Sequence, residues 1–424
     1  MTLAAGLFIL TYIGMIIFSE HRPYISSVSA LLFIILGILP VNSILKSIDF
    51  NVIFMIWGTM GLVELFTISK MPHKIADIMI NSMPNLCWII ISLSVFSGFV
   101  SAFIDNVATV LMLAPIAIAM SEKLNISPVK PIIAISISSN LQGAATLVGD
   151  TTSILLGSYM HLNFFDFFVY KGKLGLFFIV QLAALFATFI LYLNFKKLKN
   201  KINKQAVTQV SDIIPSVLLL IMVFLLIGAS FIPEYKKPAT TNGLICLSLF
   251  FTGLVYDILV YRNNKKFKYI IKNIDYKTLL LLISLFIIIG GITEAGLIEQ
   301  ISLLFTKLGS NKFLIYTVVV WSSALISAFI DNIPYVATML PVMQKLSNMT
   351  SINSTVLFFG LLIGATLGGN LTPIGASANI ASLGILRENG HKVKNKEFMK
   401  ISVPFTLSAV LAGYLSVWFI FKNV

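Results

Sequence analysis

The chain has 424 residues, of which 57% are hydrophobic and 11% charged, and it carries a formal net charge of +13. Soluble domains carry about 25% charged residues, so this composition excludes an ordinary soluble protein and favours one embedded in lipid. The lysines and arginines fall in loops beside apolar runs rather than in a patch interleaved with aromatic residues, which argues against a nucleic-acid partner.

Apolar runs long enough to cross a hydrocarbon core of about 30 Å recur along the whole chain and predict an all-α polytopic membrane protein. The first run lacks the basic leader and small-residue cleavage site of a signal peptide, so we expect it to be a span. Ten spans are expected, two of them broken (130–160 and 355–386): residues 3–19, 25–40, 50–68, 130–160, 174–195, 213–232, 241–260, 278–296, 355–386 and 402–421.

Two further apolar segments, 86–121 and 312–346, are each interrupted by the hexapeptide Ser-Ala-Phe-Ile-Asp-Asn. A polar pair halfway along an apolar run predicts a helical hairpin that enters and leaves the membrane on one side. The hexapeptides begin at residues 101 and 327, an offset of 226 (327 minus 101) that also pairs Asn85 with Asn311, Pro115 with Pro341, Gly143 with Gly369, and Thr146 with Thr372. We therefore expect a duplicated chain.

Each expected repeat holds five transmembrane helices and one re-entrant hairpin, and an odd number of spans inserts the two copies with opposite topology. The first repeat covers 1–195, with scaffold helices within 3–68; residues 196–212 form a cytoplasmic linker, and the second, inverted repeat covers 213–424. With the N-terminus outside, 21 of the 30 Lys and Arg lie on the cytoplasmic side, which agrees with the positive-inside rule. This topology places no Lys or Arg within a span and assigns Arg22 to a loop. It predicts a multi-pass protein of the plasma membrane.

The two hairpin tips carry the first candidate site. A carboxylate at membrane depth costs about 3 kcal/mol on insertion scales, so Asp105 and Asp331 need compensation. Free backbone groups and hydroxyls at a hairpin tip offer the oxygen ligands that sodium prefers, and a carboxylate can also carry a proton. The sodium candidates are Asp105, Asn106, Asp331 and Asn332, with Ser101, Thr109 and Ser327 beside them. The alternative is that both Asp residues only cap the hairpin helices.

The second candidate site is a pair of Gly- and hydroxyl-rich stretches, 140–153 and 368–379, each following a hairpin. Such a stretch inside an apolar run predicts a discontinuous helix whose exposed backbone lines a cavity. The alternative is close helix packing through small residues. Asp150 has no acidic counterpart, because Ala376 stands at the matching position. The candidate ligands are Asn140, Thr146, Gly149, Asp150, Asn370, Thr372, Gly375, Ser377 and Asn379.

The four histidines fall in expected loops without ligand spacing, so no metal centre is predicted. A nucleophile elbow, a phosphate-binding loop and a zincin helix are absent from the sequence, which argues against an enzyme. We therefore expect no cofactor beyond a coupling sodium ion or proton.

These motifs identify a resemblance. SAFIDNVATVLMLAP and SAFIDNIPYVATMLP resemble the hairpin tips of the ion-transporter superfamily, in the branch of arsenite permeases, NhaD-type antiporters, the melanosomal P protein and CitMHS-like permeases. GAATLVGD and NLTPIGASANI resemble the unwound loops of that branch, and the likeness covers essentially the whole chain. Where family members commonly follow Gly-Asp with Pro-Pro-Asn, this chain has Thr151, Thr152 and Ser153, which leaves the substrate open.

The resemblance implies a secondary transporter of the elevator type, in which hairpins and broken helices move past a scaffold, and a homodimer. It also leaves room for an accessory ATPase. Two functions stay open: coupling of sodium or proton movement, by antiport or symport, and permeation of an anion such as citrate, a dicarboxylate or arsenite. A channel and an intramembrane protease that uses two Asp residues are weaker alternatives.

Overall fold

A computed structural model describes residues 1–18, 21–123, 126–198, 206–261 and 264–423. The described chain is helical except for a two-stranded antiparallel ribbon, β1 (Val169–Tyr170) and β2 (Lys173–Leu174), which the sequence did not predict. Part of the expected linker, and several of the lysines and arginines counted for topology, lie outside the described residues.

Six described helical stretches are long and apolar enough to cross a membrane. They are α4 (Phe50–Ile68), α10 (Leu176–Phe195), α12 (Thr241–Tyr261), Phe267–Glu294, which joins α13 (Asn264–Asn273) to α14 (Tyr276–Glu294), Ser354–Leu371, which begins with α18 (Ser354–Leu362), and α20 (Asn395–Phe421).

The spans expected at 3–19, 25–40 and 213–232 correspond to helices that are shorter than these six. These residues form α1 (Thr2–Ile17), α2 (Arg22–Ile35) and α11 (Ile214–Ser230), of 16, 14 and 17 residues. At 1.5 Å per residue, α2 is about 21 Å long, less than the hydrocarbon thickness. Its first residue is therefore not obliged to lie at the membrane surface.

Two helix pairs contain the hexapeptides. The first is α6 (Leu86–Ser101) with α7 (Asn106–Lys123), and the second is α16 (Lys312–Ser327) with α17 (Asn332–Thr350). Each pair starts at an asparagine whose side chain accepts a backbone N–H of the first turn, Asn85 in one and Asn311 in the other. Such caps satisfy donors that have no partner within the helix.

The two Gly-rich stretches interrupt helices. In the first, α8 (Val129–Gly143) ends and α9 (Thr151–Tyr159) begins after a seven-residue gap; in the second, α18 passes through a π-helical turn (Ile363–Leu367) and a 3-10 turn (Gly369–Leu371) before α19 (Ser377–Glu388). Short helices that the sequence reading did not assign complete the chain: α3 (Ile44–Ser47), α5 (Met71–Ser82), α15 (Leu297–Thr306) and the 3-10 turns Val41–Ser43, Phe165–Phe167 and Glu234–Lys236.

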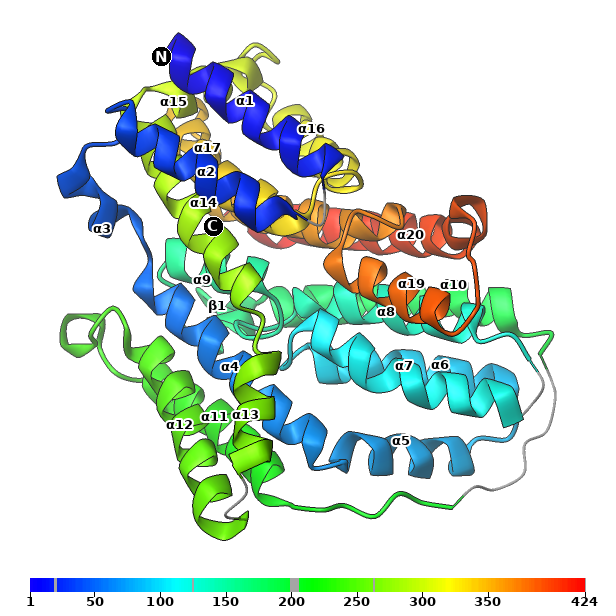
Figure 1. Ribbon diagram of the computed structural model, residues 1–424. Helices are drawn as coiled ribbons and strands as arrows, with labels where there is room; N and C mark the ends of the chain where they lie inside the picture. Colours follow the sequence, from blue (N-terminus) through cyan, green and yellow to red (C-terminus); the bar gives the residue numbers. More distant parts are fainter. Residues whose placement is uncertain (19–20, 124–125, 199–205, 262–263, 424) are drawn as a thin grey trace.

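The packing brings distant segments together (Figure 1). Helix α4 packs along α12 and α2 packs along α14, whereas α6 packs on α8, α16 on the π-helical turn, and α10 on α20. Helix α19 lies against α7 and α8, and α9 lies against α17 and α4. The two tips and both helix breaks therefore meet inside the molecule.

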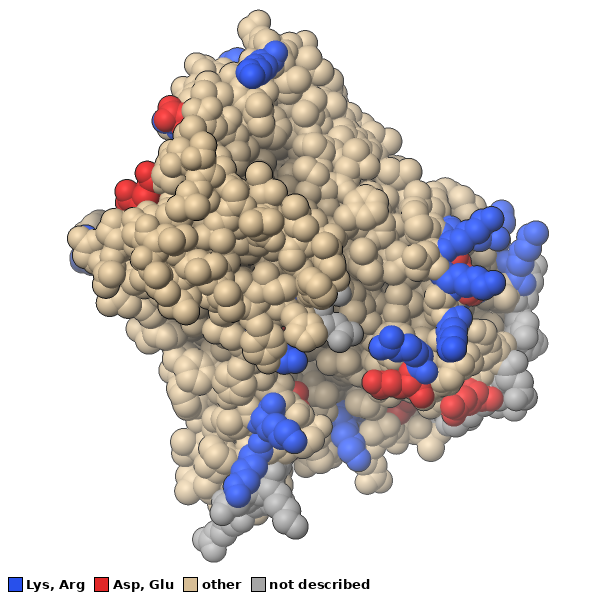
Figure 2. Space-filling model, turned by 45° about the horizontal axis from the view of Figure 1, so that its top comes forward, with Lys and Arg blue, Asp and Glu red and all other residues tan. Residues whose placement is uncertain are grey.

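Most of the surface in Figure 2 is free of charge, and the Lys and Arg side chains gather at its edges. The exposed side chains of α10 and α12 include Leu185, Phe186 and Leu259. Such helices expose apolar faces because their solvent is the hydrocarbon of the bilayer.

Candidate functional site

Both hairpin-tip aspartates bind backbone N–H groups of the helix that follows. Oδ1 of Asp105 accepts from Val107 and Ala108, at 3.0 and 3.2 Å, and Oδ1 of Asp331 accepts from Ile333 at 3.2 Å. The capping role considered from the sequence is therefore present at both tips. It uses one carboxylate oxygen of each residue and leaves the other for a further role.

Three backbone carbonyl oxygens surround each of two glycines in the helix breaks. A Cβ added to Gly149 would lie 2.7 Å from the oxygen of Gly143, 2.8 Å from that of Ala102 and 2.9 Å from that of Ser101. A Cβ added to Gly375 would lie 2.6 to 2.8 Å from the corresponding oxygens of Gly369, Ser327 and Ala328. We call these two groups the first and second carbonyl cages. Carbonyl oxygens at helix C-termini carry partial negative charge, so each cage makes the surroundings of its glycine electronegative, while the glycine itself fills the point on which the oxygens converge.

Threonine hydroxyls hold the two cages in the same way. Thr146 donates to the carbonyl of Ala102, and Thr372 donates to the carbonyl of Ala328. The backbone carbonyl oxygens of Ser101 and Ser327 accept no hydrogen bond from any described residue. A buried carbonyl without a donor is uncommon, so each cage retains an oxygen with capacity for another partner.

The hydroxyls beside the two cages differ. The Ser327 hydroxyl donates to the carbonyl of Ala365 at 2.7 Å, whereas the Ser101 hydroxyl is fully buried and finds no partner among the described residues. A buried hydroxyl without a hydrogen bond costs about 1–3 kcal/mol. A ligand that bonds to this hydroxyl would remove that cost.

A continuous set of hydrogen bonds joins the two tips. The Asn106 amide donates to Asn140 at 3.0 Å, and Asn140 donates to the carbonyl of Thr366 at 2.8 Å. The hydroxyls of Thr366 and Thr152 lie 2.9 Å apart, and Thr152 donates to Asp150 at 2.9 Å. The Asn332 amide of the second tip donates to the same Asp150 oxygen at 3.2 Å.

The remaining predicted residues lie within or directly beside this network. Asn379 contacts Gly369, Asn370 and Thr372 and accepts from Ser136, while Asn370 donates to the carbonyl of Ile137 at 2.8 Å. Ser377 donates to Asp331 at 2.7 Å. Among the described residues, the Thr109 hydroxyl donates only to the backbone oxygen of Asp105, which is a helix-stabilising contact. The structure thus brings the sixteen predicted residues into one region, together with Ser136, Thr152 and Thr366, which the sequence reading missed.

The expectation that no Arg or Lys is buried within a helix is wrong at Arg22. Its guanidinium lies 2.8 Å from Oδ2 of Asp331, and the two side chains are 9% and 4% exposed. Arg22 is the first residue of α2, in the connection that the charge count assigned to a cytoplasmic loop. Its side chain is therefore buried against the second tip rather than exposed in a loop.

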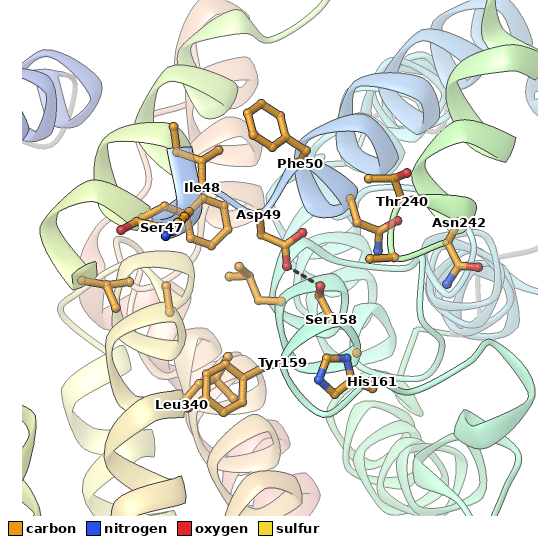
Figure 3. A pocket seen from close by; sticks show the side chains of 18 of the residues that line it. Ser47, Ile48, Asp49, Phe50, Ser158, Tyr159, His161, Thr240, Asn242 and Leu340 are labelled. Atoms are coloured by element: carbon orange, nitrogen blue, oxygen red, sulfur yellow. Dashed lines mark hydrogen bonds between the residues drawn. The ribbon is translucent and has the colours of Figure 1, made fainter. Parts of the chain in front are cut away.

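A cavity of about 1010 Å³ lies beside the network, between α3, α4 and α14 on one side and α9 and α17 on the other. Figure 3 shows Asp49 and Ser158 meeting across it, where Ser158 donates to the Asp49 carboxylate. Its polar lining includes Lys46, His161 and Glu294. None of the sixteen predicted residues lines this cavity, although α9 and α17 connect its wall to them.

Among the described residues, no three His, Cys, Asp or Glu side chains lie close enough together to hold one metal ion. Asp105, Asp150 and Asp331 therefore do not converge on one point. The cation ligands that this region offers are carbonyl, hydroxyl and single carboxylate oxygens, which suit a hard monovalent cation better than a transition metal.

Relatives of known sequence include uncharacterized transporters and a membrane protein. An uncharacterized transporter of Mycobacterium tuberculosis is 28% identical over 426 residues, covering 98% of this chain and 97% of its own. The 46 kDa membrane protein of Mycobacterium leprae is 28% identical over 326 residues, covering 75% and 74%. The human P protein is 27% identical and covers 87% of this chain, but the match spans only 53% of that protein.

Two solved structures share the fold. The YdaH transporter of Alcanivorax borkumensis superposes with a TM-score of 0.60 at 12% identity, covering 89% of this chain and 87% of its own. MtrF of Neisseria gonorrhoeae, described as illuminating a class of antimetabolite efflux pumps, gives 0.52 at 14% identity, covering 96% and 85%. Residues 12–364 match the family model CitMHS, described as citrate transporter. This chain is therefore a multi-pass membrane transporter that belongs to the CitMHS family, and it is not an enzyme.

Proposed function

We propose that the protein is a secondary active transporter of the elevator type that couples the movement of sodium or protons to transport, with the coupling cation bound at the first hairpin tip. The observation that carries this proposal is the first carbonyl cage. It combines the Ser101 carbonyl oxygen, which accepts no hydrogen bond from a described residue, with the buried, unpartnered hydroxyl of the same residue. Asp105 follows four residues later and keeps one carboxylate oxygen without a partner among the described residues.

In this proposal the chain consists of two inverted repeats, 1–195 and 213–424, and their symmetry underlies the transport cycle. The bounds of α4 and α14 differ by 226 residues at both ends, as do those of α6 and α16. Paired contacts follow the same offset, such as Thr146 with Ala102 and Thr372 with Ala328. In the inverted arrangement the two tips enter from opposite faces, so that neither provides an open pore. A homodimer held by the scaffold helices belongs to the same proposal.

An anion such as citrate, a dicarboxylate or arsenite is the second candidate cargo. The description of the matching family model favours it. Antiport and ion-coupled anion uptake are separated by a flux panel in proteoliposomes with imposed sodium and pH gradients, with and without radiolabelled citrate.

The first test replaces Asp105 by Asn in full-length protein reconstituted into liposomes. We expect cation-coupled flux to fall to background, because the amide keeps the size of the side chain but removes its charge and its ability to carry a proton. Flux by Glu299→Gln, which removes only an exposed carboxylate paired with Lys345 on the surface, should equal that of the unmodified protein. Full sodium- or proton-driven flux in Asp105→Asn would contradict the proposal.

A further inference from the structure

The two tip aspartates occupy matching positions but have different neighbours. Asp331 forms a buried ion pair with Arg22 and also accepts from Ser377. Asp105 receives only backbone N–H groups, and the structure gives it no cationic partner among the described residues. At the offset of 226, Ser248 stands where a second copy of Arg22 would be. The first tip therefore lacks the built-in positive charge of the second.

Building on the proposed ion coupling, we infer that Arg22 is a permanently bound cation for the second tip, so that only the first tip takes up sodium from solution. A buried carboxylate has to be neutralised by a proton, a bound cation or an ion pair. At Asp331 the guanidinium meets this requirement. At Asp105 the carboxylate is neutralised by an ion that enters and leaves the site.

The hydroxyls of the two cages show the same asymmetry independently. Ser327 already uses its hydroxyl in a bond to Ala365, whereas the Ser101 hydroxyl has no partner among the described residues. Acids are also distributed unequally, since Asp150 stands in the first break and Ala376 at the matching position of the second. The first tip and the first break thus carry two acids, Asp105 and Asp150, without a cationic partner among the described residues, whereas the second tip carries one acid, which is paired with Arg22.

Arg22 belongs to the protein and is not cargo. Its Nε donates to the carbonyl of Met15 at 3.3 Å, which fixes the guanidinium to the end of α1. Tyr12 of α1 also donates to the carbonyl of Pro334 at 2.7 Å, close to Asp331 along α17. The α1–α2 pair therefore presents Arg22 to the second tip from outside the hairpin.

The experiment counts sodium ions bound per chain, by equilibrium binding of radiolabelled sodium to the purified full-length protein. We expect one ion for the unmodified protein and none for Asp105→Asn. Arg22→Gln should bind one ion more than the unmodified protein, because Asp331 then needs a new cation. Asp331→Asn and the charge-neutral pair Arg22→Gln with Asp331→Asn should each keep one ion, since neither creates nor removes a sodium site.

Equal sodium binding by Arg22→Gln and the unmodified protein would overturn the inference, and so would two ions in the unmodified protein with one lost in Asp331→Asn. Absence of sodium from the unmodified protein contradicts sodium coupling instead. That result also removes the first tip's sodium site from the inference; one ion in Arg22→Gln would still support Arg22 as the cation of the second tip, and none would overturn it. If Arg22→Gln does not fold, as judged by gel filtration, sodium loss in either Asp331→Asn or the double variant overturns the inference.

Discussion

At the scale of single residues, the two cage glycines show why the helix breaks have their composition. A side chain at Gly149 or Gly375 would occupy the space on which three carbonyl oxygens converge. The close approach of the tip backbone to the break therefore requires that no Cβ be present. Both glycines have negative φ, so the requirement is for space rather than for a left-handed backbone.

We predict that Gly375→Ala reduces transport by about tenfold or more, because displacing a packed backbone costs about 1–3 kcal/mol. The added methyl group would lie 2.6 Å from the oxygen of Gly369 and 2.7 Å from that of Ser327. The matched control is Gly384→Ala in α19, where nothing lies within 4 Å of an added Cβ. Flux in proteoliposomes measures both variants, and equal activity of the two would contradict a tight second cage.

Ten of the sixteen candidate residues could be picked out from the sequence because the duplication repeats them in register. The pairs Thr146 with Thr372 and Gly149 with Gly375 were found by offset and make equivalent contacts in the structure. Arg22 was missed because it is 309 residues from Asp331 and has no copy at the offset. The charge rule then treats any arginine between apolar runs as a loop residue. The unused hydroxyl of Ser101 could not be predicted, since Ser327 has the same local sequence.

At the scale of elements, glycines set how closely the long helices pack. A Cβ added at Gly61 in α4 would overlap the ring of Phe250 in α12, and one at Gly291 in α14 would overlap the ring of Phe33 in α2. Both aromatic side chains are fully buried. In both helix pairs, α4 with α12 and α14 with α2, a glycine on one helix therefore leaves room for a phenylalanine of the other. Small residues at such contacts are typical of membrane helices, where no hydrophobic effect drives the helices together.

We predict that Gly61→Ala lowers thermal stability by about 1–3 kcal/mol through overpacking. Phe250→Leu removes the ring atoms that the new methyl group would meet. The double variant should therefore lose less free energy of unfolding than the two single variants lose together. Thermal unfolding of the purified protein gives the coupling between the two changes. Gly228→Ala in α11, where an added Cβ meets nothing within 4 Å, is the control. Strict additivity would show that Gly61 and Phe250 do not define this contact.

The sequence predicted elements where apolar length and a polar interruption were both clear. Segments 86–121 and 312–346 were recognised from Asp-Asn in an apolar run, and α6 and α16 end at Ser101 and Ser327, the first residues of the two hexapeptides. Helices α5 and α15 were missed because they are 12 and 10 residues long and amphipathic rather than apolar throughout. The π-helical turn after α18 has no sequence signal, because it depends on packing against α16.

At the scale of the whole molecule, the cavity separates two sets of helices that the proposed mechanism requires to move. Its lining divides between the start of α4 with α14 and the segments α9 and α17, which continue into the break and the second tip. Asp49 caps α4 through the backbone N–H of Val52 and also accepts from Ser158 of α9, so one side chain contacts both sets. An elevator step would have to separate Asp49 from Ser158.

We predict that joining Asp49→Cys to Ser158→Cys with a short bifunctional thiol reagent stops transport and that cleavage of the linker restores it. The native cysteines, Cys87 and Cys246, are both buried and should react little. The variants that carry only Asp49→Cys or only Ser158→Cys, treated with the same reagent, control for unspecific modification. Flux is measured in proteoliposomes before the reagent, after it and after cleavage. If α9 moves past α4, a covalent link between them holds one state and transport falls to background. Full transport by the linked protein would show that α4 and α9 belong to one rigid body, and the moving part would then have to exclude α9.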